Sequence, residues 1–217
     1  SSPTRIQFLL PGETHLPGSV PGKTGTVNVS TAGASFRVAI WSTDIHWNRT
    51  PPINTTVIRL STSPVTGDPY AVMPGDQQMV GGTTDFTVTY LRATRNRSVG
   101  NATMMYSSHV LVASVASGDA LVSTVSAGMR VNPLPVSKLQ VLMDGETADP
   151  GFGPYDTGNT GGRVGTPTSA NAGGIATATV RTVDMYWNLN ISSAVTLDSD
   201  TSDPNDTEPA GTLQILP

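Results

Sequence analysis

Few residues in this sequence have the side chains that enzyme chemistry uses, and one pair of them is close enough in sequence to act together. Asp44 and His46 are separated by a single residue, Ile45, and are followed by Trp47-Asn48. An Asp can orient a His as a general base. The loop returns at residues 184–188, where tyrosine replaces the histidine and the Asp, Trp and Asn are kept. The pattern therefore favours a structural loop whose carboxylate binds backbone N–H groups.

Other catalytic patterns are missing from the sequence. The chain has no cysteine and no Gly-x-Ser-x-Gly motif, and its other histidines, His15 and His109, have no matching partner in the repeat. The glycines around residues 158–165 precede no predicted helix, so they lack the N–H array of a phosphate loop. We predict no catalytic residue and no enzyme activity.

A calcium site is the one metal hypothesis that the sequence offers. Aspartates at alternate positions of a turning backbone can supply the six to eight oxygens that calcium takes. The stretch lacks the central Gly and the terminal Glu of a calcium loop, so a solvated charged loop is the favoured interpretation and no cofactor is expected. The candidate ligands are Asp198, Asp200, Asp203 and Asp206.

Tryptophans could form a platform for a sugar ring. Trp47 and Trp187 occupy equivalent repeat positions, which favours a shared packing role. Trp41 has Arg181 as its counterpart, so a glycan ligand at Trp41 stays open as an alternative.

Seven asparagines stand in Asn-x-Ser/Thr sequons, whereas roughly three would be expected by chance at this composition. The excess predicts N-linked glycans and hence an extracellular or cell-surface location. A Thr-rich β-protein also generates sequons freely, which is the competing interpretation. The predicted acceptors are Asn28, Asn48, Asn54, Asn96, Asn101, Asn190 and Asn205.

The elements that position these residues are predicted to be strands throughout. The chain is rich in Ser, Thr, Gly and Pro and only 13% charged, which suits turn-rich β-structure. Short apolar runs alternate with polar residues and end at Gly, Pro or Asp. The predicted strands of the first half are residues 6–10, 27–29, 36–40, 56–61, 70–73, 84–91, 102–107, 110–117 and 121–131.

The chain contains a duplication at a period of roughly 130 to 140 residues. Residues 6–14 return as residues 139–147, and the loop at residues 44–48 returns at 184–188. We predict an all-β fold of two tandem antiparallel sandwiches, residues 1–132 and 138–217, joined by a stiff Pro-rich linker at 133–137. Nothing in the second copy matches residues 86–131, so we expect it to be incomplete and completed in trans by strand addition.

The ordered set of motifs resembles the tandem bacterial immunoglobulin-like repeats of large surface and secreted proteins. It comprises Pro-Gly-Glu-Thr at 11–14, Gly-x-x-Gly-Thr at 22–26, Ala-Gly at 32–33 and the loop at 44–48. The second copy carries them at 144–147, 162–166, 172–173 and 183–188, with Asp144 in place of the proline. The resemblance implies immunoglobulin-like sandwiches that serve as mechanical or adhesive modules, without catalytic residues.

The net charge of −4 gives no basic surface for nucleic acid, and no apolar run reaches the roughly 18 residues of a membrane span. The leading hypothesis is a structural subunit of an extracellular glycosylated filament that assembles head to tail with copies of itself through strand complementation. The alternative is an adhesin-type module that binds a glycan or protein through loop residues such as Trp41, His46 and Tyr155.

Overall fold

The computed structural model describes residues 2–50, 54–94, 108–156, 158, 160–190, 195–198, 205, 207 and 213–215. The chain divides into two compact units, unit 1 with residues 1–132 and unit 2 with residues 133–217. The described residues form strands, turns and loops without any helix, which confirms the all-β class. None of them belongs to a helix that is long and apolar enough to cross a membrane.

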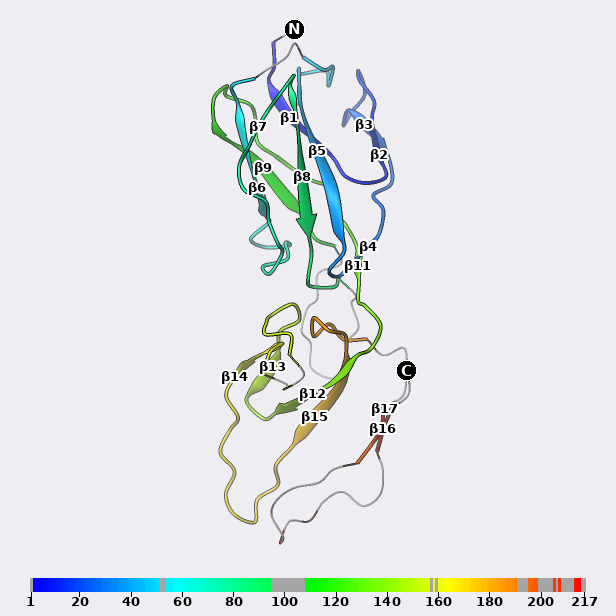
Figure 1. Ribbon diagram of the computed structural model, residues 1–217, viewed down its shortest axis with the longest axis vertical. Coiled ribbons are helices and arrows are strands. Elements are labelled where there is room, and N and C mark those ends of the chain that lie inside the picture. Colours follow the sequence, from blue (N-terminus) through cyan, green and yellow to red (C-terminus); the bar gives the residue numbers. More distant parts are fainter. Residues whose placement is uncertain are drawn as a thin grey trace. The chain divides into compact units, whose positions relative to one another are not determined.

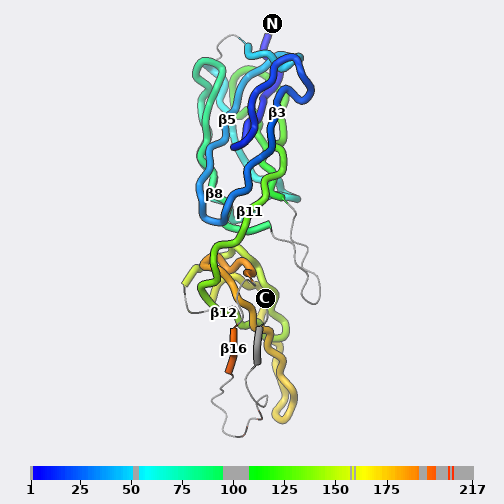
Figure 2. Tube along the Cα trace, turned by 90° about the vertical axis from the view of Figure 1, so that its right-hand side faces the viewer, coloured from blue at the N-terminus to red at the C-terminus, as the bar shows by residue number. Residues whose placement is uncertain are grey.

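Unit 1 contains two antiparallel sheets, which Figure 1 shows as separate layers. The first sheet places β5 (Ser35–Thr43) between β1 (Arg5–Leu9) and β8 (Thr83–Thr89). Figure 2 shows β5 and β8 alongside each other in this unit. The second sheet has the order β10-β9-β6-β7, formed by β10 (Thr124–Val125), β9 (Leu111–Ser117), β6 (Val57–Thr62) and β7 (Gln77–Gln78).

The alternation of side chains along each strand produces the core of unit 1. In β5, Val38 and Ile40 are fully buried while Arg37 between the apolar positions is exposed. Successive side chains of a strand point to opposite faces of the sheet. One face of each sheet is therefore apolar, and the hydrophobic effect favours its burial in the core of the unit. The buried apolar positions of the other strands include Ile6, Phe8, Ile58, Leu60, Phe86, Val88, Leu111 and Ala113.

Two short pairs complete the described strands of unit 1. β2 (Glu13–His15) and β3 (Lys23–Gly25) form an antiparallel hairpin, and β4 (Ser30–Thr31) pairs in parallel with β11 (Val131–Asn132). The hairpin returns in unit 2 as β13 (Glu146–Ala148) and β14 (Arg163–Gly165).

Unit 2 repeats the first strand pairing of unit 1. β12 (Lys138–Met143) pairs with β15 (Ala178–Val183) in antiparallel register, as β1 pairs with β5. A further antiparallel pair is formed by β16 (Val195–Leu197) and β17 (Leu213–Ile215).

Three predicted strands of unit 1 differ in the structure. Within residues 70–73 only Val72 makes an isolated bridge, because the Asp68 carboxylate accepts the Tyr70 N–H at 2.8 Å and forms a turn. Residues 121–131 contain two short strands and an interruption, where the Ser126 hydroxyl accepts the Leu111 N–H at 3.0 Å. The predicted strand at 27–29 is a loop that leads into β4, and the one at 102–107 lies outside the described residues.

Candidate functional site

The loop at residues 44–48, here called the carboxylate loop, is organised around one buried carboxylate. Asp44 is 3% exposed, and its Oδ1 accepts the N–H groups of His46 and Asn48 at 2.8 and 2.9 Å. The Asn48 side-chain amide donates to Asp44 Oδ1 and Oδ2 at 3.3 and 3.0 Å. His46 contributes its backbone N–H to this network, and its side chain is exposed. The loop is held by charge-assisted hydrogen bonds.

Unit 2 contains the same carboxylate loop at residues 184–188. Asp184 is fully buried and accepts the Tyr186 and Asn188 N–H groups at 2.8 and 2.9 Å. The Asn188 amide donates to its two oxygens at 3.3 and 3.0 Å. The equivalence of the two geometries explains why the histidine is not kept, since this position supplies only a backbone donor.

A tryptophan occupies the tip of each carboxylate loop in a left-handed conformation. Trp47 and Trp187 both have a φ of 66°, which is uncommon for a non-glycine residue. Each indole ring packs on a glycine of the neighbouring hairpin, Gly22 or Gly162, where a Cβ would collide with the ring. The glycines are therefore required by the tryptophans.

A buried glutamine ties the first strand of each unit to the same glycine. Gln7 Nε2 donates to the Gly22 carbonyl and Gln140 Nε2 donates to the Gly162 carbonyl, both at 2.7 Å. The two glutamines are 1% and 0% exposed. Buried amides need such partners, so the polar residue inside each apolar strand has a structural role.

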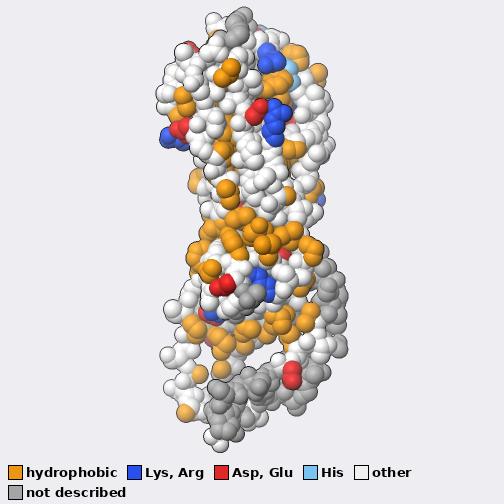
Figure 3. All heavy atoms as spheres, viewed as in Figure 1, with side chains coloured by type: hydrophobic (Ala, Val, Ile, Leu, Met, Phe, Trp, Pro, Cys, Tyr) orange, Lys and Arg blue, Asp and Glu red, His pale blue; other side chains and the backbone are white. Residues whose placement is uncertain are grey.

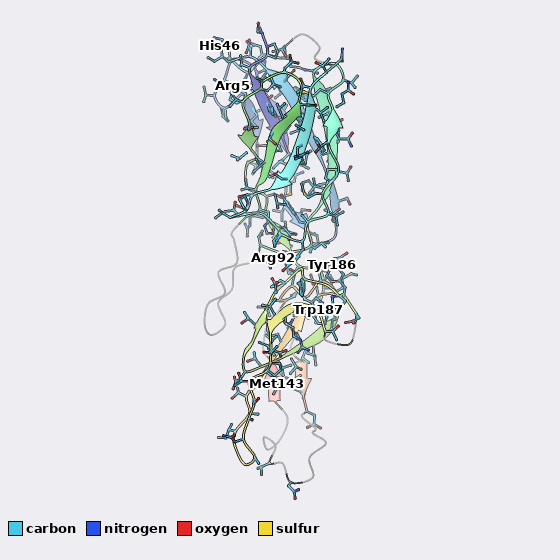
Figure 4. All side chains as sticks on the ribbon, turned by 90° about the vertical axis from the view of Figure 1, so that its left-hand side faces the viewer. Arg5, His46, Arg92, Met143, Tyr186 and Trp187 are labelled. Carbon is cyan, nitrogen blue, oxygen red and sulfur yellow. The ribbon has the colours of Figure 1, made fainter. Side chains whose placement is uncertain are left out.

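A cation covers the tryptophan in both units. The Arg5 guanidinium lies 5.0 Å from the Trp47 ring centroid, and Lys138 Nζ lies 3.5 Å from that of Trp187. Figure 4 shows Arg5 and His46 at one end of unit 1, and Tyr186 and Trp187 together in unit 2. Burial lowers the pKa of Lys138, which also donates to the carbonyls of Tyr155 and Asp156. Cation–π contact of this kind stabilises the tryptophan position.

The Pro-Gly-Glu-Thr turn is fixed by a second buried carboxylate in each unit. Glu13 accepts the Leu10 N–H at 2.9 Å and pairs with Lys23 at 2.8 Å. Glu146 accepts the Met143 N–H at 2.9 Å and pairs with an arginine, Arg163, at 3.0 Å. Both units thus have an ion pair at this place, with a lysine in unit 1 and an arginine in unit 2. The ion pair joins the two strands of the hairpin in each unit.

The Pro-rich linker is fastened to unit 2. The Leu134 N–H donates to Asp184 Oδ2 at 2.9 Å, and Asn190 Nδ2 donates to the Leu134 carbonyl at 2.6 Å. The Ser137 N–H donates to the Val183 carbonyl at 3.0 Å. The residues predicted as a spacer thus have one end anchored on a carboxylate loop.

The predicted glycan acceptors differ in their exposure and in the hydrogen bonds of their side-chain amides. Asn28, Asn48, Asn54 and Asn205 are exposed, although the Asn48 amide is engaged by Asp44. Asn190 is 7% exposed and its Nδ2 is used by the linker. Asn96 and Asn101 lie outside the described residues.

The described residues do not bring the candidate calcium ligands together. Asp198 is exposed, and Asp200, Asp203 and Asp206 lie outside the described residues. Among the described residues no group of three or more His, Asp or Glu side chains is arranged to hold a metal ion.

The residues named for glycan or protein recognition lie in different surroundings. Trp41 has the Arg49 guanidinium 4.3 Å from its ring centroid and the His15 ring centroid at 4.9 Å. Tyr155 is 37% exposed, and its hydroxyl donates to the Gly151 carbonyl at 2.7 Å. The two residues belong to different units.

Sequence reasoning missed a buried polar cluster in unit 1. Asp68 is fully buried and accepts the N–H groups of Leu91 and Arg92 at 2.6 and 2.9 Å. His109 is 1% exposed, contacts the Tyr90 ring at 4.9 Å, and has Nε2 2.8 Å from the Arg92 carbonyl. Burial lowers the pKa of His109, and the Asp68 charge opposes that shift. The Gly67-Asp68-Pro69 turn was the available signal.

Comparisons with protein-family models, with curated proteins and with solved structures found no match.

Asp44→Asn and Asp184→Asn are each expected to lower the free energy of unfolding by about 2–3 kcal/mol, because each removes the charge from a buried acceptor of backbone N–H groups. Chemical denaturation measures the loss. Asp85→Asn is the control and should have little effect, since its ion pair with Arg37 is exposed and screened by water. Equal effects of the three substitutions would contradict the structural role of the carboxylate loops.

Acidification is expected to destabilise unit 1 through His109. The folded-state pKa of His109 is lowered, whereas the unfolded chain takes up the proton near the ordinary value of about 6.5. Its contribution is therefore fully present above that value and is lost as the pH falls below it. When the pH is lowered from 8 to 5, the midpoint temperature of thermal unfolding should fall less steeply in His109→Gln than in the parent chain. The exposed-site control His46→Gln should behave like the parent chain. An unchanged slope in His109→Gln would refute the assignment.

Proposed function

We propose that this chain is a structural part of an extracellular, N-glycosylated filament or stalk, built from tandem immunoglobulin-like β-modules that join head to tail through β-strand complementation. The observation that carries the proposal is the carboxylate loop, which is built twice with the same hydrogen bonds and the same Trp conformation. A geometry repeated in this way is what a serial array needs from each of its modules.

The residues that the two units share also support a structural role. The shared Asp, Gln and Glu side chains bind backbone groups within their own unit, and the shared Asn amide donates to the Asp carboxylate. Reactive sites need groups whose pKa values and positions serve a substrate, whereas these polar groups are used to hold turns. The one His of the first loop has a tyrosine as its counterpart.

Head-to-tail joining is supported by an unequal use of strand edges. In unit 1, β5 pairs on both edges, with β1 and with β8. In the described part of unit 2, β15 pairs with β12 alone apart from its last two residues. An open strand edge is a template for pairing with another chain, and a heterologous contact that does not close produces a fibre.

An adhesin-type module is the second candidate. It is favoured by the exposed aromatic residue Tyr155, which contacts Tyr186 edge to face at 5.0 Å on the carboxylate loop of unit 2. Such a pair offers a surface for a glycan or a protein loop.

Electron microscopy of the purified chain over a range of concentrations tests the leading proposal. We expect fibres whose fraction rises with protein concentration, because a head-to-tail contact is bimolecular. Particles that stay single at every concentration would refute the assembly. Saturable binding to a glycan array by single particles, lost in Tyr155→Ala, would favour the adhesin.

Glycopeptide mass spectrometry of protein from its native source tests the glycan part. We expect occupancy at the exposed Asn28 and Asn54 and none at Asn190, whose amide is buried. Asn28→Gln and Asn54→Gln should each remove one glycan mass, and Asn190→Gln should remove none. Unmodified Asn28 and Asn54, or a glycan on Asn190, would contradict this ranking.

A further inference from the structure

The hairpin loops beside the two tryptophans differ in length. Residues 16–22 join β2 to β3 in unit 1, and residues 149–162, here called the insertion loop, join β13 to β14 in unit 2. Each loop is closed by a hydrogen bond from the N–H of its first residue to the carbonyl of its last, at 2.8 and 2.6 Å. The two loops therefore start and end alike, and the additional residues of unit 2 lie between these fixed ends.

The backbone of the insertion loop is bound to the tryptophan and the cation of unit 2. Trp187 Nε1 donates to the Pro154 carbonyl at 2.7 Å. Lys138 Nζ donates to the Tyr155 and Asp156 carbonyls at 3.2 and 2.9 Å. Two side chains thus bind three consecutive carbonyls of one short segment, residues 154–156.

The aromatic side chains of the insertion loop are only partly buried. Phe152 and Tyr155 are 39% and 37% exposed, and Figure 3 shows apolar side chains at the surface of unit 2. The Tyr155 ring meets the Tyr186 ring edge to face at 5.0 Å. Hydrogen bonds to the backbone therefore have a main part in holding the segment on Trp187.

Unit 1 has the same three positions, a cation, a tryptophan and a ring of the carboxylate loop. They are occupied by Arg5 for Lys138, by Trp47 for Trp187 and by His46 for Tyr186. Figure 4 shows Arg5 and His46 at the same end of the unit. Trp47 is half-buried and His46 is exposed, whereas Trp187 is fully buried.

The donors at these positions of unit 1 have no acceptor in the described part of the chain. Trp47 Nε1 makes no hydrogen bond there, and the Arg5 guanidinium contacts the Trp47 ring without forming an ion pair. A tryptophan N–H usually finds a partner when it is removed from water. The shorter loop of unit 1 thus leaves accessible the groups that the insertion loop binds in unit 2.

We propose that Arg5, His46 and Trp47 form a binding site for a short acidic peptide segment of a partner protein, bound as unit 2 binds its own residues 154–156. The segment has the sequence pattern proline, aromatic residue, aspartate. Trp47 Nε1 donates to the carbonyl of the proline, and the Arg5 guanidinium donates to the next two carbonyls. The aromatic ring lies against His46. This site goes beyond the proposed function, because it requires neither a filament nor a glycan.

The charge of Arg5 favours an acidic segment. The nearby carboxylates of unit 1 are already engaged, since Asp44 binds its own loop and Glu13 pairs with Lys23. A guanidinium presents five donors in a planar fork, so Arg5 has enough donors for two carbonyls and a carboxylate. In unit 2 the Asp156 charge acts on the equivalent cation, where it opposes the lowering of the Lys138 pKa by burial.

A synthetic peptide of residues 151–157 is the probe, because it carries the three carbonyls, the ring and the carboxylate. NMR of the full chain follows the indole N–H signals, with the Trp47 signal assigned from Trp47→Phe. We expect the Trp47 signal to shift saturably and the Trp187 signal to stay. A control peptide with Tyr155→Ala and Asp156→Lys should bind at least about tenfold more weakly. An unmoved Trp47 signal, or equal binding of the two peptides, would overturn the proposal.

Two variants of the chain test the cation. Arg5→Gln removes the charge and most of the donors, so peptide binding should fall at least about tenfold, since charge-assisted hydrogen bonds are the stronger ones. Arg37→Gln is the matched control, because Arg37 lies in an exposed ion pair with Asp85, and it should retain binding. Thermal unfolding checks that both variants fold. Equal affinities of the two variants would assign the binding to another place.

An exchange of loops tests whether the short loop keeps the site accessible. Residues 149–162 in place of residues 16–22 should put a segment of the chain itself on Arg5 and Trp47, and the added peptide should then no longer shift the Trp47 signal. Hydrogen exchange of the Trp47 indole N–H in the parent chain is the second measurement. We expect fast exchange that slows when the peptide binds. Slow exchange without peptide would overturn the proposal, because the chain itself would then cover the site.

Discussion

The described structure depends on a buried carboxylate that must be completely hydrogen-bonded. A charge removed from water is tolerated only when donors surround it. Asp44 and Asp184 each accept two N–H groups of their own loop and an Asn amide, and Asp184 accepts the Leu134 N–H in addition. Wrapping the backbone around one acceptor fixes the loop and forces the Trp into a left-handed conformation. The Trp ring then requires a glycine in the hairpin, and that glycine receives the buried Gln of the first strand. One electrostatic requirement thus positions a loop, a hairpin and a strand.

The two units share this polar framework and differ in how far their apolar faces are covered. Unit 1 combines the framework with two sheets and a buried core, whereas β12 and β15 keep an accessible face and edge in the described part of unit 2. The framework is satisfied locally, so it forms whether or not the face is covered. The hydrogen bonds of the carboxylate loop in unit 2 are therefore formed although Leu139 and Ala178 are exposed.

Sequence reasoning identified the long strands and the repeat because both depend on patterns that are local in the chain. The period of two in β5, β8 and β9 and the recurrence of Asp, Trp and Asn were visible without coordinates. The reasoning failed where a side chain competes with the sheet for backbone groups, as Asp68 does at Tyr70 and Ser126 does at Leu111. The burial of His109 and the fastening of Leu134 by Asp184 were equally hidden, since each depends on residues distant in sequence. The open face of unit 2 became visible only by comparing burial at equivalent positions.

The closure of each framework within its own unit has a consequence for how such proteins change over generations. Every hydrogen bond of a carboxylate loop described above joins residues of one unit, and in unit 2 the linker is included in that set. An in-frame duplication or deletion of one repeat, linker and loop together, leaves no buried charge without its donors. The number of repeats is then free to drift by recombination at little cost in stability, and the reach of the whole molecule becomes a quantity that selection can adjust independently of the stability of any single unit.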